Sequence, residues 1–215
     1  MPKYAVMSSG VGRCASKWLV SMFRYNVPNA IVSHEGFATR GAAQSNIWVE
    51  SGDAALLVDI SWKMFSLVYS FPFRPKMCVL LRDPLDIVQS WMTRRIVGTH
   101  VSPDFASKES FAYYYMLHYL FYLDSGIHFA KAAGLDISYW DYLRYTTPEG
   151  FTELADYVGA DLKSPLQTVP PIDVRPKDQK IDIVEWCDGD TTRLERALDG
   201  FPHAKAAYEK VWSER

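Results

Sequence analysis

The sequence predicts a single α/β domain with three layers and a central, mainly parallel sheet. Short apolar runs suited to buried strands alternate with segments whose apolar residues recur at helical spacing, which is the pattern of a sheet with helical crossovers. A chain of 215 residues that is 48% hydrophobic can bury one sizeable core, and no internal repeat is visible. We therefore treat residues 1–215 as one domain.

The first half of the chain opens with a strand, a turn and a helix. The apolar run at 4–7 predicts a strand and is closed by Ser-Ser-Gly at 8–10. Apolar residues recur every three to four positions over 14–25, which predicts a helix. A second strand is predicted at 30–32, and the polar segment at 36–46 is interpreted as a surface loop.

The rest of the chain continues the alternation. Continuous apolar runs at 54–60 and 77–81 are typical of strands buried on both faces of a parallel sheet, and helical patterns follow them at 61–70 and 84–97. The remaining predicted elements are a long aromatic helix at 107–133, a strand at 137–140, a short helix at 148–158, a proline-rich stretch at 163–180, and surface helices at 190–198 and 203–212.

Charge and cysteine content narrow the possible partners and location. The formal net charge of −2 offers no overall attraction to nucleic acid or to a membrane surface, so we expect neither as a partner. Cys14, Cys78 and Cys187 are odd in number and lack Cys-x-x-Cys spacing, which argues against a disulfide framework and against a zinc site. With no apolar stretch long enough for a signal peptide, we expect a cytoplasmic protein.

The first loop combines glycines with basic residues ahead of a helix. Gly10 and Gly12 allow a tight turn whose backbone N–H groups converge, while Arg13 and Lys17 add positive charge to the positive end of the helix dipole. Such a loop favours phosphate binding. A plain turn with solvated basic residues is the alternative, because one glycine-rich turn is a weak signal.

The loop does not fit the nucleotide-triphosphatase pattern. That pattern needs Gly, four residues, then Gly-Lys-Ser/Thr, whereas the positions counted from Gly10 hold Ala15, Ser16 and Lys17. Neither the second glycine nor the lysine matches. ATP is therefore the weaker hypothesis for the ligand.

A second motif favours a phosphate-binding role for the first loop over a plain turn. Arg82, Asp83 and Pro84 follow the strand at 77–81, and Ser90 comes eight residues after the arginine, two turns into the next helix. Arg-Asp-Pro alone is a common helix start. Together with the first loop, however, it resembles the sulfotransferase superfamily, whose members use 3′-phosphoadenosine-5′-phosphosulfate (PAPS) and have a P-loop-like fold.

The resemblance covers about residues 3–162 and implies a set of nucleotide-binding positions. A looser third match lies at 139–161, where Trp-Asp-Tyr-Leu stands in register with a Tyr-Glu-Asp-Leu segment of the family. Ala15 and Lys17 depart from the family pattern, which puts glycine and a hydroxyl residue there. The positions matching the 5′-phosphosulfate loop are Gly12, Arg13, Cys14, Ala15, Ser16, Lys17 and Trp18.

The same resemblance implies roles for individual cations. Arg82 and Ser90 would bind the 3′-phosphate, which an arginine can hold in bidentate fashion. Arg13 takes the place of a basic catalytic residue and would stabilise charge on the leaving phosphate. Arg175 and Lys177 lie in a late basic segment of the kind that folds over the 3′-phosphate in this family.

A general base is expected at a neighbouring strand end. Glu35 is favoured over His34, because some family members carry a glutamate after the second strand and only one of two adjacent side chains faces the donor. Asp59, Ser61 and His100 are further candidates for the acceptor side. Metal is not required by this chemistry, so we expect no metal ligands.

These observations predict an enzyme that transfers a sulfuryl group from PAPS to a hydroxyl or amine of a small-molecule or glycan acceptor. Two alternatives stay open: an ATP-dependent small-molecule kinase, and a non-catalytic nucleotide-binding protein on the same scaffold. A kinase would need magnesium, whereas the other two would bind adenosine 3′,5′-bisphosphate without it.

Overall fold

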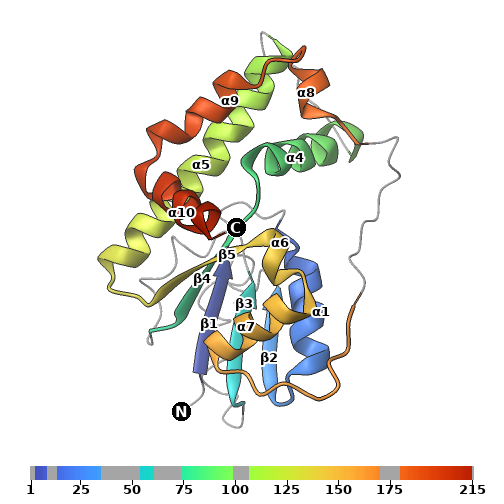
Figure 1. Ribbon diagram of the computed structural model, residues 1–215, viewed down its shortest axis with the longest axis vertical. Coiled ribbons are helices and arrows are strands. Elements are labelled where there is room, and N and C mark those ends of the chain that lie inside the picture. The colour runs from blue at the N-terminus through green and yellow to red at the C-terminus, as the bar shows by residue number, and fades with distance from the viewer. Residues whose placement is uncertain are drawn as a thin grey trace.

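A five-stranded sheet in which every described strand runs parallel to its neighbours forms the centre of the molecule (Figure 1). Its order is β2-β3-β1-β4-β5. The strands are β1 (Lys3–Ser8), β2 (Ala30–His34), β3 (Leu56–Ile60), β4 (Lys76–Leu81) and β5 (Ile137–Asp141). The computed structural model describes residues 3–8, 14–34, 54–60, 74–98, 107–169 and 180–214. The predicted α/β class is confirmed, and the described sheet is parallel throughout.

The burial of the strands explains their sequences. All five residues of β3 are buried, as are the five residues of β4 that follow Lys76. Strands covered on both faces cannot alternate apolar and polar side chains, so they appear as continuous apolar runs. The edge strands β2 and β5 are mostly half-buried, which permits polar residues such as Ser33 and Ser138.

The helices flank the sheet and gather beyond its carboxyl edge. In Figure 1, α1 and α7 lie in front of the sheet, where α1 contacts β2 and β3 and α7 contacts β1. A second group, α4, α5, α8 and α9, lies together in the upper part of the same view. The described helices are α1 (Ser16–Asn26), α4 (Pro84–Gly98), α5 (Lys108–Ala132), α6 (Tyr142–Tyr145), α7 (Pro148–Val158), α8 (Ile183–Trp186), α9 (Thr192–Arg196) and α10 (Pro202–Ser213).

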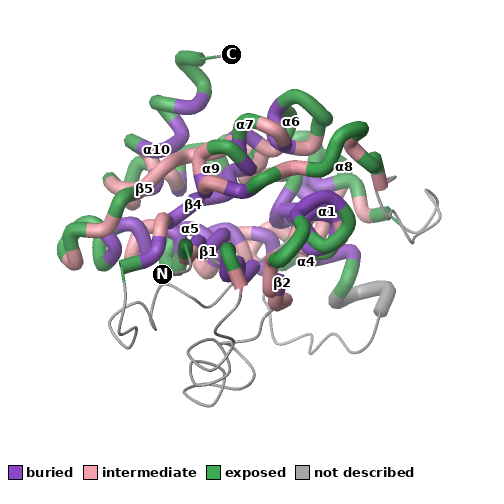
Figure 2. The backbone as a smooth tube through the Cα atoms, turned by 90° about the horizontal axis from the view of Figure 1, so that it is seen from below, coloured by how far each residue is buried: buried purple, intermediate pink, exposed green. Residues whose placement is uncertain are grey.

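Aromatic packing joins α1 to α7. The ring of Phe151 meets Trp18 and Phe23 edge-on, with centroids 6.0 Å and 5.1 Å apart. A close approach at the start of α7 needs a glycine, because a Cβ on Gly150 would lie 2.0 Å from the Arg144 carbonyl oxygen. The buried residues, purple in Figure 2, accordingly run through the strands and the inward faces of the helices packed on them.

Several element boundaries differ from the sequence prediction. Strand β2 continues to His34 instead of ending at residue 32, so His34 belongs to the sheet and not to the following loop. Helix α1 begins at Ser16 and not at residue 14, because Ala15 has a left-handed backbone conformation.

Short helices account for the other differences. The segment predicted as one helix at 190–198 is α9 followed by a 3-10 helix at Ala197–Gly200. The turns of α6 and α8 were not predicted, because four residues are too few to show helical periodicity. The predicted helix at 61–70 and loop at 36–46 lie outside the described residues.

Candidate functional site

The carboxyl ends of β1 and β4 lie side by side at the centre of the sheet. After β1 the chain crosses to β2 on one side, whereas after β4 it crosses to β5 on the other side. In parallel α/β sheets such a reversal leaves a crevice beyond the strand ends, where ligands bind. The chain reaches Cys14 and α1 after β1, and Arg82 directly follows β4. The two principal motifs therefore leave adjacent strands at one edge of the sheet.

The backbone at the start of α1 is unusual. Ala15 has φ 49° and ψ 30°, in the left-handed region that glycine adopts readily and that costs other residues about 1–2 kcal/mol. Ala15 therefore has a conformation that glycine would adopt at lower cost. Gly12 and Arg13, which precede this turn, lie outside the described residues.

A hydrogen bond joins the first residue of α1 to the end of β2. The Ser16 hydroxyl lies 3.1 Å from Nε2 of His34. Both side chains are half-buried, so the pair is partly shielded from water. His34 is thus brought to the predicted nucleotide loop, where it orients the Ser16 hydroxyl. Glu35, the favoured base, lies outside the described residues.

The other positions matching the loop divide between backbone and side-chain roles. Cys14 is buried and can offer a ligand only its backbone, whereas Lys17 is exposed on the first turn of α1. Trp18 is buried, and its indole N–H donates to the Val169 carbonyl at 2.7 Å. The Trp18 side chain therefore anchors a distant segment.

That segment runs along α1 and leads to the predicted basic flap. Buried Asn26 binds Gln167 twice, accepting from its N–H at 2.6 Å and donating to its carbonyl at 2.8 Å. On the far side of the flap, the N–H of Ile181 donates to Thr93 Oγ1 on α4 at 3.1 Å. Residues 170–179, including Arg175 and Lys177, lie outside the described residues, and their flanks are fixed to α1 and α4.

Arg-Asp-Pro supplies the start of α4. Oδ1 of Asp83 accepts from the N–H groups of Leu85 and Asp86, at 2.9 Å and 3.3 Å, and Pro84 is the first helical residue. An acid at the cap and a proline at the first position are the ordinary preferences of a helix start. Asp83 and Pro84 are therefore explained by local structure, which leaves Arg82 to be explained.

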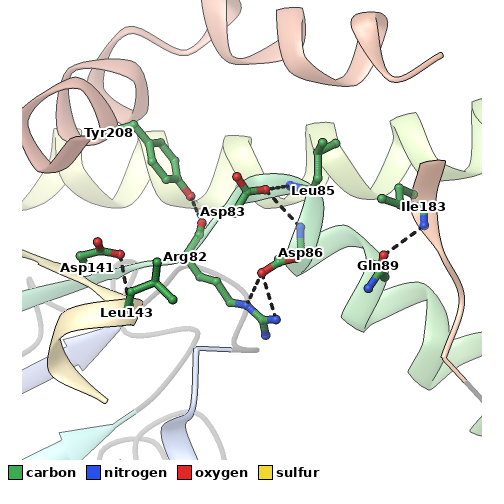
Figure 3. A network of polar contacts seen from close by, with 9 residues as sticks. All are labelled: Arg82, Asp83, Leu85, Asp86, Gln89, Asp141, Leu143, Ile183 and Tyr208. Atoms are coloured by element: carbon green, nitrogen blue, oxygen red, sulfur yellow. Dashed lines mark hydrogen bonds and ion pairs between the residues drawn. The ribbon is translucent and has the colours of Figure 1, made fainter. Parts of the chain in front are cut away.

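The Arg82 side chain lies along α4 (Figure 3). Its guanidinium pairs with Asp86, at 3.2 Å from both Nε and a terminal nitrogen, and lies 4.7 Å from the centroid of the Tyr142 ring. The Arg82 side chain is 24% exposed and that of Asp86 is 51% exposed. Ser90 is half-buried four residues after Asp86, so both lie on one face of α4.

Two buried tyrosines support the backbone of Arg82. The Tyr208 hydroxyl donates to the Arg82 carbonyl at 2.7 Å and is also hydrogen-bonded to the Tyr119 hydroxyl. Burial raises the pKa of both tyrosines well above the usual range, so both stay protonated. Helices α5 and α10 thus hold the strand end from which the Arg82 side chain projects.

The short helix α6 contacts both motifs. The hydroxyl of buried Tyr145 donates to the Cys14 carbonyl at 3.0 Å, across 131 residues of sequence, while Tyr142 places its ring against Arg82. Burial raises the pKa of Tyr145 well above its usual range, which keeps it a donor. Asp141 begins the helix by accepting from the Leu143 N–H at 3.2 Å.

We expect Tyr145→Phe to lower the free energy of unfolding by about 1–2 kcal/mol, because the buried Cys14 carbonyl loses its donor. Tyr142→Phe is the matched control. It keeps the ring against Arg82 and should change stability by less than about 0.5 kcal/mol. Urea denaturation measures both, and equal losses would show that the Tyr145 hydrogen bond contributes little.

The structure describes only one of the three candidates for the acceptor side. Asp59 is fully buried and accepts from the Ser33 hydroxyl at 2.6 Å, which suits a role in joining β2 to β3 more than one in an acceptor pocket. Ser61 and His100 lie outside the described residues. Within the described ranges, no three His, Cys, Asp or Glu side chains form a metal-binding group, and no helix is long and apolar enough to cross a membrane.

Comparison with known proteins adds no identification. No protein-family model matches this chain, and no curated protein matches it.

Sequence analysis missed several residues that shape the site. Asp86 carried a usable signal, since an acid four residues after Arg82, in the first turn of the predicted helix, is placed to pair with it. Tyr142 lay within the third matching segment but had no assigned role. Tyr145, Asn26 and Tyr208 carried no signal, because their partners are distant in sequence.

Proposed function

We propose that the protein transfers a sulfuryl group from PAPS to a hydroxyl or amine of a small-molecule or glycan acceptor. The observation that carries this proposal is the pair of contacts made by α6. Tyr145 binds the Cys14 carbonyl beside the first loop, and Tyr142 lies against the Arg82 guanidinium. The three stretches that resemble the family are thereby in direct contact at the carboxyl edge of a parallel sheet, which supports one shared site.

The donor would lie between the starts of α1 and α4. The left-handed turn at Ala15 leads the backbone N–H groups into α1, whose positive end favours a 5′-phosphosulfate, with Arg13 and Lys17 adding charge. The Ala15 side chain cannot accept a hydrogen bond from the N–H groups at the start of α1. A bound anion could serve as their acceptor. Arg82 and Ser90 are assigned to the 3′-phosphate.

The ion pair between Arg82 and Asp86 does not stand against this assignment. Exposed pairs of this spacing contribute only about 0.3–0.5 kcal/mol, and the Asp86 side chain is about half exposed. A bidentate bond from arginine to phosphate is stronger than that. The 3′-phosphate can therefore replace Asp86 as a partner of the guanidinium.

In the transfer step, the acceptor oxygen or nitrogen attacks sulfur in line as the bond from sulfur to the bridging phosphate oxygen breaks. The acceptor's proton passes to a base, and adenosine 3′,5′-bisphosphate leaves. Arginine does not release a proton at neutral pH, so Arg13 acts by stabilising charge on the bridging oxygen. The hydrogen bond between His34 and Ser16 favours Glu35 as the base and leaves His34 to position the start of α1.

Calorimetric titration tests the proposal. Adenosine 3′,5′-bisphosphate should bind without magnesium and more tightly than ADP. Sulfuryl transfer from labelled PAPS to a panel of sugar and phenolic acceptors then tests turnover. Preference for ADP with magnesium would support the kinase alternative, and tight binding without transfer to any acceptor would support the non-catalytic one.

We expect Asp86→Asn to raise the affinity for adenosine 3′,5′-bisphosphate by about twofold, because it removes a carboxylate that competes with the phosphate for Arg82. Glu153→Gln is the control, since it breaks a surface ion pair with Arg144 and should leave the affinity unchanged. Weaker binding by Asp86→Asn would mean that Asp86 holds Arg82 in its binding position.

A further inference from the structure

Two histidines face each other where α10 crosses α5. Nδ1 of His128, on α5, lies 3.1 Å from Nε2 of His203, the second residue of α10. The ring centroids are 4.9 Å apart and the ring planes are inclined by 36°. His128 is exposed and His203 is half-buried, so the space beside the two nitrogens opens to water.

The two separations fall within the range expected for imidazoles bound to one metal ion. A collinear hydrogen bond of this length would put the ring centroids about 5.4 Å apart, whereas the observed centroids are 4.9 Å apart. Two imidazole nitrogens about 2.05 Å from one ion, at N–metal–N angles of about 90–110°, lie about 2.9–3.4 Å apart with centroids about 4.5–5.2 Å apart, a range that includes both observed separations. The observed pair therefore needs little movement to become a chelate.

Neighbouring groups hold the pair in place. Asp124, one turn before His128, accepts from the backbone N–H groups of His203 and Ala204 at 2.7 Å and 2.9 Å. This contact fixes the start of α10 against α5 and puts a negative charge beside the histidines, which offsets part of the charge of a cation. Both ligands thus come from helices that are already docked.

We propose that His128 and His203 form a binding site for a divalent transition metal ion that prefers imidazole, such as Zn²⁺. The described residues supply no third His, Cys, Asp or Glu ligand, so water completes the coordination shell. The site is therefore weaker than a four-ligand structural zinc site.

An ion bound here would tie α10 to α5. Tyr208 of α10 and Tyr119 of α5 meet through their hydroxyls, and Tyr208 also binds the Arg82 carbonyl. Metal binding would hold together the helices that support Arg82. The inference rests on the histidine geometry and does not depend on the identity of the nucleotide.

Calorimetric titration with Zn²⁺ at pH 7.5, with Mg²⁺ as the control ion, tests the site. We expect His128→Gln and His203→Gln each to lose about one equivalent of bound zinc. His118→Gln is the matched control, because His118 lies on α5 against the rings of Tyr114 and Tyr122 and should keep that equivalent. Unchanged zinc binding in both test variants would overturn the proposal, as would its loss in the control.

Side-chain ¹⁵N NMR of the unmodified protein gives a second readout that needs no variant. Zinc should shift Nδ1 of His128 and Nε2 of His203 to values typical of metal-bound nitrogen, and it should raise the melting temperature. Resonances at these two nitrogens that do not respond to zinc would rule the site out.

Discussion

Replacing Arg82 with alanine is expected to weaken binding of adenosine 3′,5′-bisphosphate by about tenfold to a hundredfold, with little change for ADP. A hydrogen-bonded charge pair contributes about 1.5–3 kcal/mol, and only the first of these nucleotides carries a 3′-phosphate. The fold should survive, because the Tyr208 hydroxyl binds the backbone of residue 82. Ser90→Ala removes a neutral hydroxyl donor and should cost about 1 kcal/mol of binding.

Arg144→Ala provides the matched control for Arg82. The substitution removes the same charge as Arg82→Ala does. In the unmodified protein the Arg144 guanidinium lies on the surface, 2.7 Å from a carboxylate oxygen of Glu153. Isothermal titration of both nucleotides against each variant distinguishes the loss of a direct contact with the 3′-phosphate from the effect of removing one positive charge at a distance. Equal losses for the two nucleotides, or an equal loss in Arg144→Ala, would remove the assignment of Arg82 to the 3′-phosphate.

Replacing Arg13 with alanine is expected to lower sulfuryl transfer by about a hundredfold or more while donor affinity falls by about tenfold or less. The bridging oxygen gains most of its negative charge only as the bond to sulfur breaks, so a cation beside it stabilises the transition state more than the ground state. Lys17, Arg82, Ser90 and the start of α1 would still hold the donor.

The rate is measured with an acceptor identified from the panel, and the affinity by titration with adenosine 3′,5′-bisphosphate. Arg13→Lys should recover part of the rate, because lysine restores the charge and is common at this position in the resembled family. If Arg13→Ala abolishes nucleotide binding or leaves the rate intact, Arg13 has a binding or structural role and the catalytic assignment is wrong.

The strands and most helices could be predicted from the sequence because their signals are local. The buried strands appear as apolar runs, broken by Asp59 in β3 and preceded by Lys76 in β4, and α7 shows its cap Thr147, an early proline and helical spacing. Boundaries were less predictable. The left-handed conformation of Ala15 could not be predicted, because alanine itself disfavours that conformation.

Some residues of the candidate site could also be predicted from the sequence, whereas others could not. Arg82 and Ser90 could be singled out because Arg-Asp-Pro with a serine eight residues later resembles a family motif, and Asp86 should have been added because it stands four residues after Arg82. Whether these residues bind a nucleotide stays a prediction. The contact between Ser16 and His34 could not be anticipated, because it depends on β2 continuing two residues beyond its apolar run, to His34.

By itself the sequence determined the class of the domain, since alternating strand and helix patterns in one chain of this size lead to a parallel sheet with crossovers. It also placed two cation-bearing motifs after strands. Only the tertiary structure decided that β1 and β4 are neighbours, and that Tyr145 and Tyr142 link the two motifs. Periodicity depends on residues a few positions apart, whereas these contacts join residues that only the packed chain brings within reach.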